Sequence, residues 1–374
     1  MSRIIVNINP EVLRWAREEG RYSQEEMAEK LEVEIGRYQQ WEQVGKEIPF
    51  SKLDTLSNTL KRQVAFFFLP QPPQSISQPK DYRNRSGSDQ SISKEVAFAI
   101  RQAHYFKQTA IDLREEAFWE KAYAWEHELE AWQDNVRHDM PQMVAWLREV
   151  FEIDMDTQLR WKTESDAYKN WRKAVEEKLG ILVFQFSMPM EEVQGFCLTD
   201  VRPYAIVVNS KQSYTGRIFT IFHELAHILR RQSGLCMIDY TVSKQQQPEE
   251  WECNRFAGMF LAPVTSLVPT DNLEEIQTYA RKLKISREAY LRRLKEEGFI
   301  QDTQFFVLLD EIKKTYLPKS SAKSGIVTPE RKSLSTRGET FFNLILDALQ
   351  ANQISYSQAS GVLDLRINKI VSIL

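Results

Sequence analysis

Phe219-Thr-Ile-Phe-His-Glu-Leu-Ala-His-Ile-Leu229 is an apolar stretch that contains two histidines and one glutamate. Its apolar residues recur at helical spacing, which predicts a buried amphipathic helix. On such a helix His223 and His227 lie one turn apart on the same face. Two imidazoles in this arrangement can hold one metal ion, and Glu224 can reach a water on that ion. The alternative, a solvated helix with unrelated histidines, does not fit the Phe, Ile and Leu neighbours.

Catalytic zinc usually takes three protein ligands, so a third ligand is expected from a later helix. The segment that begins at Pro248 offers three carboxylates, Glu249, Glu250 and Glu252. Glu250 and Asn254 are four residues apart, so both can face one site, with Asn254 steadying a ligand. We therefore favour Glu250 as the third Zn²⁺ ligand and keep Glu252 as the alternative.

Three short strands are predicted before the metal helix. They are β-branched and aromatic runs at residues 181–186, 195–198 and 204–208. Three strands followed by the metal helix predict a small antiparallel sheet in an α+β core within a mostly helical chain. If the last strand lies at an edge, an extended peptide could pair with it.

The motifs resemble those of the ImmA/IrrE family of zinc metallopeptidases. That family places phenylalanine and threonine before H-E-x-x-H and later shows E-x-x-A-N-x-F-A, which corresponds here to Glu250 through Ala257 with Cys253 in place of alanine. Phe260-Leu-Ala-Pro263 keeps only part of the family's usual ending. The resemblance implies a zincin- or gluzincin-like core, and it agrees with the choice of Glu250.

Composition favours a cytoplasmic protein. The formal net charge is −3, so no global attraction to nucleic acid or anionic membrane is expected. Three cysteines without C-x-x-C spacing argue against a disulfide framework. Neither a signal peptide nor a membrane-spanning run is evident in the sequence.

The first 70 residues predict four or five short helices with tight turns. Asn9-Pro10 and the capping box from Ser23 to Glu26 mark two helix starts. The segment Ser23–Leu31 and the runs after it resemble the XRE (lambda-repressor-like) helix-turn-helix domain. Its possible DNA contacts are Arg37, Gln39, Gln40 and Lys46. Glu32 and Glu34 would repel a phosphate backbone, so the alternative is a helical module that docks onto another protein or onto the rest of this chain.

The chain divides into six predicted segments. They are 1–70, the XRE-like domain; 71–93, a linker; 94–178, a tryptophan-rich helical region; 179–300, the ImmA/IrrE-like peptidase core with a trailing helix-turn-helix; 301–336, a helix and linker; and 337–374, a helical tail. We interpret the tryptophans of the third segment as packing residues. The histidines there, at 104, 127 and 138, stand alone and are not expected to bind metal.

Two functions compete on the sequence. The first is a zinc endopeptidase in which Glu224 activates a zinc-bound water and later protonates the leaving amine. The ImmA/IrrE resemblance implies that its substrate is a partner regulator such as an XRE-type repressor. The second is a DNA-binding regulator or antitoxin-like protein-binding module with a structural or silent metal site. The sequence leaves the oligomeric state open.

Overall fold

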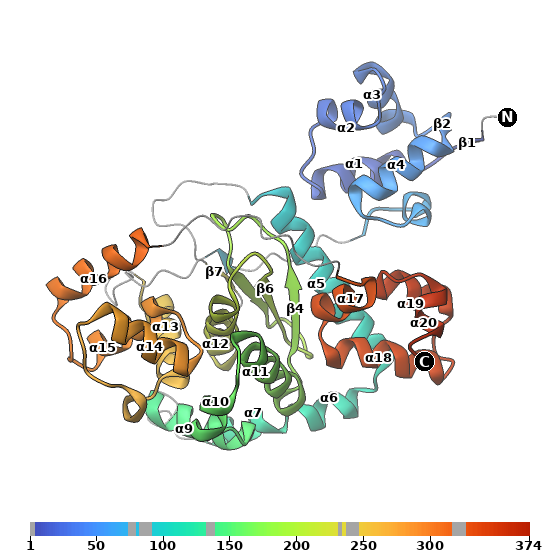
Figure 1. Cartoon of the computed structure of the whole chain (residues 1–374). Coiled ribbons are helices and arrows are strands. Elements are labelled where there is room, and N and C mark those ends of the chain that lie inside the picture. The colour runs from blue at the N-terminus through green and yellow to red at the C-terminus, as the bar shows by residue number, and fades with distance from the viewer. Residues whose placement is uncertain are drawn as a thin grey trace. The chain divides into compact units, whose positions relative to one another are not determined.

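The computed structural model describes residues 4–73, 80–81, 92–131, 139–230, 234–236, 247–315 and 327–374 (Figure 1). It contains two compact units. The N-terminal unit comprises Met1–Gln78 and Ser88–Gln102, and the C-terminal unit comprises Pro79–Gly87 and Ala103–Leu374. Most of the predicted linker 71–93, and residues 316–326 of the second predicted linker, lie outside the described residues.

The N-terminal unit is built from short helices, as the sequence predicts. They are α1 (Pro10–Glu19), α2 (Gln24–Lys30), α3 (Ile35–Val44), α4 (Phe50–Leu60) and the 3-10 helix η1 (Val64–Phe68). Asn9 caps α1, and Ser23 and Glu26 form the predicted capping box at α2. The sequence did not predict the small antiparallel sheet of β1 (Ile5–Val6) and β2 (Ile48–Pro49).

The core of the N-terminal unit contains side chains from all four helices. Leu13, Met27, Trp41 and Leu56 are almost completely buried together. Their spacing on each helix follows the apolar periodicity of the sequence, so burial of these faces explains why the helices form.

The C-terminal unit contains a five-stranded mixed sheet with the order β3-β7-β5-β6-β4. The strands are β3 (Lys80–Asp81), β4 (Leu182–Phe186), β5 (Gly195–Leu198), β6 (Ala205–Asn209) and β7 (Gly234–Cys236). The three predicted strands are confirmed. The sheet is not purely antiparallel, because β4 runs parallel to β6 and β3 runs parallel to β7.

The strand at 204–208 is not an edge strand. Its counterpart β6 pairs with β4 on one side and with β5 on the other. Both of its hydrogen-bonding sides are therefore occupied, and the expectation that a substrate peptide could add to this strand is wrong.

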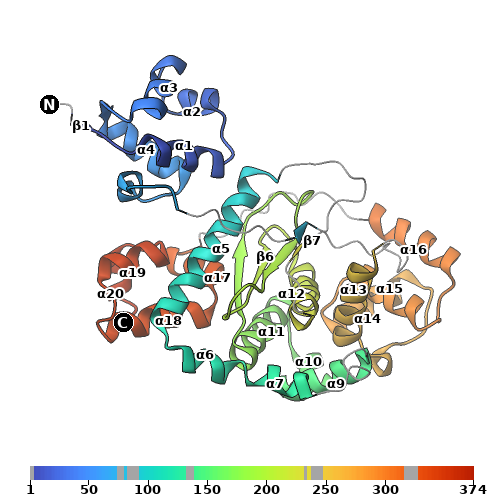
Figure 2. The same ribbon diagram turned by 180° about the vertical axis from the view of Figure 1, so that it is seen from behind.

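Helices cover both faces of this sheet. On one face lie α11 (Glu164–Leu179) and α12 (Tyr214–Leu229) (Figure 1). The other face carries the end of α5 (Lys94–Leu113), seen in front of the strands in Figure 2. Phe106 of α5 and Phe341 of α18 (Glu339–Gln350) contact Phe184 of β4, with ring centroids 5.3 and 5.6 Å away. The helix predicted to carry the metal ligands is α12, and it packs against strands β5 and β6 of the sheet.

The remaining helices of the C-terminal unit surround this core. They are α6 (Glu116–Ala122), α7 (Ala124–Ala131), α9 (Met140–Phe151), α10 (Met155–Arg160), α13 (Pro248–Leu261), η2 (Val264–Ser266), α14 (Leu273–Leu283), α15 (Arg287–Glu296), α16 (Asp302–Lys314), α17 (Pro329–Arg337), α19 (Tyr356–Leu363) and α20 (Ile367–Val371). Across the described residues, none of the helices has the length and apolar character that crossing a membrane requires. The fold is α+β and mostly helical, as predicted.

The tryptophans of the helical middle region pack as predicted where they are described. Trp119, Trp125 and Trp171 are buried, and the Trp125 indole donates to the carbonyl of Leu179. Trp132 and His138 lie outside the described residues. His104 and His127 are not part of any group of metal-ligating side chains among the described residues.

Candidate metal centre

Helix α12 brings the two motif histidines to the centre of the C-terminal unit. Ser213 caps its N-terminus by accepting from the backbone N–H of Gly216. His223, Glu224 and His227 are completely buried. Burying three polar side chains is costly unless each finds a polar or metal partner, so this helix face is suited to a site rather than to plain packing.

Helix α13 supplies the third side chain. Pro248 lies in its first turn, and Glu250 points at α12 with only 3% of its surface exposed. One carboxylate oxygen of Glu250 lies 3.2 Å from Nε2 of His223, and the other lies 3.2 Å from Nε2 of His227. The two Nε2 atoms are 3.3 Å apart. The structure thus brings together the three side chains that the sequence proposed as ligands.

These donors fit a small divalent cation. Zinc takes ligand distances of about 2.0–2.1 Å, so the edge of its coordination tetrahedron is about 3.3 Å. The separations between the donors of His223, His227 and Glu250 are 3.2–3.3 Å. Two imidazoles and one carboxylate form a donor set typical of catalytic zinc, with a position left for water. The residues therefore fit zinc in both geometry and chemistry.

Asn254 orients one of the imidazoles. Its Oδ1 lies 3.1 Å from Nδ1 of His223 and accepts a hydrogen bond from it. With the proton on Nδ1, the Nε2 lone pair of His223 points at the other donors. Asn254 lies one turn after Glu250 and is 1% exposed, so one helix provides both a ligand and the group that fixes another ligand.

The Glu250 carboxyl is stabilised in its ionised form. Burial raises its pKa, but the neighbouring imidazoles of His223 and His227, when protonated, outweigh burial and hold the pKa well below its ordinary value. An anionic carboxylate is the form that binds metal.

Glu224 lies beside strand β5 of the sheet. A Cβ atom on Gly195 of β5 would lie 3.3 Å from Oε1 of Glu224 and 2.3 Å from the methyl of Thr220. The Thr220 hydroxyl exchanges hydrogen bonds with the Gln212 amide, at 3.0 and 3.2 Å. Gly195, Gln212 and Thr220 thus form the wall beside Glu224. Neither Gly195 nor Gln212 was predicted as a site residue: Gly195 reaches Thr220 through the way β5 packs on α12, and Gln212 reaches it from the turn that precedes α12.

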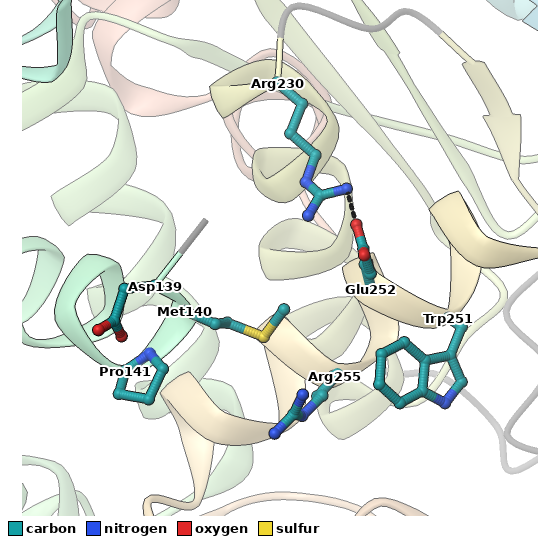
Figure 3. A pocket seen from close by; sticks show the side chains of 7 residues that line it. All are labelled: Asp139, Met140, Pro141, Arg230, Trp251, Glu252 and Arg255. Atoms are coloured by element: carbon teal, nitrogen blue, oxygen red, sulfur yellow. Dashed lines mark ion pairs between the residues drawn. The ribbon is translucent and has the colours of Figure 1, made fainter. Parts of the chain in front are cut away.

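Glu252, the alternative third ligand, does not join this group. Its side chain forms an ion pair with Arg230 at the end of α12 (Figure 3).

Cys253 occupies the position where the ImmA/IrrE motif usually has alanine. It is completely buried, and burial raises the pKa of its thiol. A small apolar role fits that environment.

The four proposed DNA contacts are placed differently from one another. Arg37, Gln40 and Lys46 are exposed. Gln39 is half-buried and donates to Gln24, whose own amide donates to the buried Glu42. Glu32, Glu34 and Glu47 are exposed on the same part of the unit, and Glu47 lies 3.5 Å from Arg37. DNA binding and the XRE helix-turn-helix identity stay predictions.

Comparisons with known proteins point to the same region of the chain. Residues 176–295 match the family described as the IrrE N-terminal-like domain, peptidase family M78. The match begins in α11 and ends in α15, so it contains the sheet strands β4 to β7 and both metal-site helices. Neither the curated proteins nor the solved structures gave a match. This part of the chain is therefore similar to the metallopeptidase-like ImmA/IrrE domain, as the sequence resemblance indicated.

Proposed function

We propose that this chain is a zinc-dependent endopeptidase of the H-E-x-x-H type. The observation that carries the proposal is the convergence of His223, His227 and Glu250, whose ligand atoms all lie within 4.8 Å of one another in a buried site. The match of residues 176–295 to a peptidase family supports the same reaction class. Zn²⁺ bound by these three side chains would act as a Lewis acid on the scissile carbonyl and would acidify water.

Glu224 is the proposed general base and acid. It directly follows a proposed ligand in sequence, and it lies on the sheet side of α12, near Gly195. In the proposed reaction its carboxylate takes a proton from the attacking water and then gives that proton to the leaving amine. Its complete burial keeps bulk water away from the carboxylate.

The proposed substrate is another protein, and a regulator of the XRE type is the candidate that the family resemblance implies. The reaction itself needs only a peptide bond within reach of the three donors and Glu224. The substrate class therefore rests on resemblance, whereas the reaction class rests on the site.

Two substitutions test the proposal. Glu224→Gln keeps the size of the side chain but removes the base, so cleavage should fall by roughly 100-fold or more while zinc stays bound. His223→Ala removes a ligand and should abolish both zinc retention and cleavage. Metal content by mass spectrometry, together with cleavage of a proteome-derived peptide library, provides the measurement. If Glu224→Gln cleaved as fast as the unchanged chain, the site would be structural and the regulator alternative would stand.

A further inference from the structure

The outer side of strand β7 is occupied by a short extended segment of this chain. Strand β3 pairs in parallel with β7, so that Lys80 lies opposite Gly234. β3 comes from the stretch Pro79–Gly87, which belongs to the C-terminal unit although the chain before and after it belongs to the N-terminal unit. Part of the predicted linker therefore acts as a strand of the sheet that packs on α12.

The register of the sheet relates β3 to the proposed base. Asp81 pairs with Leu235 of β7, and Leu235 pairs with Phe196 of β5. Beside Phe196 in β5 is Gly195, where a Cβ atom would lie 3.3 Å from Oε1 of Glu224. Neighbouring strands are about 4.8 Å apart, so the backbone of β3 lies about 10 Å across the sheet from the strand beside Glu224.

The metal donors face the flank of α12 on which β7 and β3 lie. Successive helix residues are rotated by about 100°, so His223 and His227 are turned about 100° and 60° from Glu224 in the same sense. They therefore face a flank of the helix, and α13 lies on this flank because Glu250 contacts both imidazoles. In both views of the ribbon, α12 lies between α11 and α13, and β7 lies on the α13 side of β6 (Figures 1 and 2).

The spacing of the elements puts β3 at the border of the site. Packed helices are about 8–10 Å apart, which is about two strand spacings. Because α12 packs against β5 and β6, the donors between α12 and α13 lie near β5 and β7, and β3 is the next strand outward. An extended peptide that reaches these donors along the sheet would pair with the backbone groups of β7 that β3 now occupies.

We propose that the outer edge of β7 is the surface on which an extended substrate peptide pairs, and that β3 is a built-in competitor for it. The proposal rests on the proposed peptidase function and names the regulation of that site. Pairing uses the backbone, so the edge fixes the path of the peptide and makes little use of its side chains. Substrate binds only to molecules in which β3 has left β7, so its apparent affinity is reduced by the fraction of such molecules.

The pairing of β3 is short enough to be exchanged for a substrate. It involves two residues of each strand, whereas typical strands have about five or six. One backbone hydrogen bond changes an equilibrium constant by a factor of about 2 to 10. Loss of the pairing should therefore tighten the binding of a competing peptide by about fivefold or more.

Kinetics of the full-length zinc-loaded chain test the competition. Lys80→Pro/Asp81→Pro removes both backbone N–H groups of β3 and prevents the pairing. For one peptide chosen from the library because it is cleaved, KM should fall about fivefold or more while kcat stays unchanged.

Two controls separate the backbone pairing from other effects. Lys80→Ala/Asp81→Ala keeps both N–H groups and should leave KM unchanged. Gln71→Pro, at an exposed position earlier in the same predicted linker, adds a proline away from the sheet and should also leave KM unchanged. An unchanged KM in the double proline variant, or an equal fall in the double alanine variant, would overturn the proposal.

Hydrogen exchange shows directly whether β3 covers β7. The amides of Gly234–Cys236 should exchange faster in the double proline variant, whereas those of α12 should not change if the site stays folded. Equal exchange at β7 in the two chains would mean that β3 does not protect this edge, which contradicts the proposal.

A binding measurement separates the edge from the reaction. The probe is a fluorescein-labelled peptide with the sequence of residues 77–84, and its anisotropy is measured with the zinc-loaded Glu224→Gln chain. It should bind about fivefold or more tightly once Lys80→Pro/Asp81→Pro is added, and a probe that itself carries these two prolines should show no gain. Equal binding of the first probe to both chains contradicts the competition. If no chain cleaves the library but the first probe still gains affinity, the peptidase function is wrong and the competition at β7 stands.

Discussion

Gly195 limits how the proposed base can be placed. A Cβ atom at this position would lie 2.3 Å from the Thr220 methyl and 2.9 Å from the backbone carbonyl oxygen of Val207. Gly195→Ala should therefore push Thr220 and Glu224 away from the sheet. We expect kcat for the peptide library to fall at least about tenfold and the stability to fall by about 1–3 kcal/mol, with zinc content unchanged because the ligands lie on other side chains.

A second substitution separates this positioning effect from general damage. Thr220→Ser removes the methyl that collides but keeps the hydroxyl that exchanges hydrogen bonds with Gln212. The double variant Gly195→Ala/Thr220→Ser should recover part of the lost kcat, whereas Thr220→Ser alone should have a small effect. If the double variant is as slow as Gly195→Ala, the methyl contact does not place Glu224.

The residues of the site differ in how far sequence could predict them. His223, Glu224 and His227 belong to one helix, so their relative placement follows from helical periodicity alone. Glu250 joins the site only because two helices touch. The sequence narrowed the choice of third ligand to three neighbouring acids, because they all lie in the first turns of α13. The place of Gly195 depends on how β5 lies over α12, which no local pattern encodes. The relative placement of residues within one helix is therefore predictable from sequence. The placement of residues that meet only through the packing of a strand on a helix is not.

The elements α12 and α13 are held together by aromatic packing behind the metal centre. Phe222 of α12 stacks on Phe260 of α13 with ring centroids 4.2 Å apart, and Trp171 of α11 meets Phe222 edge-on at 5.1 Å. Phe222 and Phe260 are completely buried. The distance between the histidines and Glu250 therefore depends on this contact.

Phe260→Ala should loosen both the fold and the site. We expect a loss of about 3–5 kcal/mol in the free energy of unfolding, measured by urea denaturation, since a buried aromatic ring leaves a cavity. Zinc affinity should fall as well, because Glu250 shares α13 with Phe260. Phe306 on α16 is 51% exposed, and Phe306→Ala should cost about 1 kcal/mol or less with zinc affinity unchanged. Equal losses in the two variants would mean that the stack does not hold the helices.

The sheet also shows what could and could not be predicted from the sequence, here at the scale of elements. Strand composition at 181–186, 195–198 and 204–208 was enough to predict three strands. It did not give their order, because buried strands of either direction are apolar on both faces. The parallel pairing of β4 with β6, and the burial of β6 between two neighbours, follow from the connections between strands and not from their residues.

At the scale of the whole molecule, all proposed zinc ligands belong to the C-terminal unit. Ligand binding stabilises only the part of a chain whose folded state forms the site, by about 2.7 kcal/mol when free ligand is 100 times the dissociation constant. Zinc should therefore slow backbone hydrogen exchange in α12 and α13 of the full-length chain by about 100-fold wherever exchange requires the site to unfold. Exchange in α1 to α4 should not change.

Hydrogen-exchange mass spectrometry of the same chain with zinc and with a chelator measures both units in one experiment. His223→Ala is the matched control, since it removes one ligand and should abolish the protection of α12 and α13 while α1 to α4 again stay unchanged. Protection that spread to α1 to α4 would mean that the two units unfold as one, contrary to their separate cores. Protection that remained in His223→Ala would mean that zinc binds elsewhere, and the three-ligand site would then lose its main physical support.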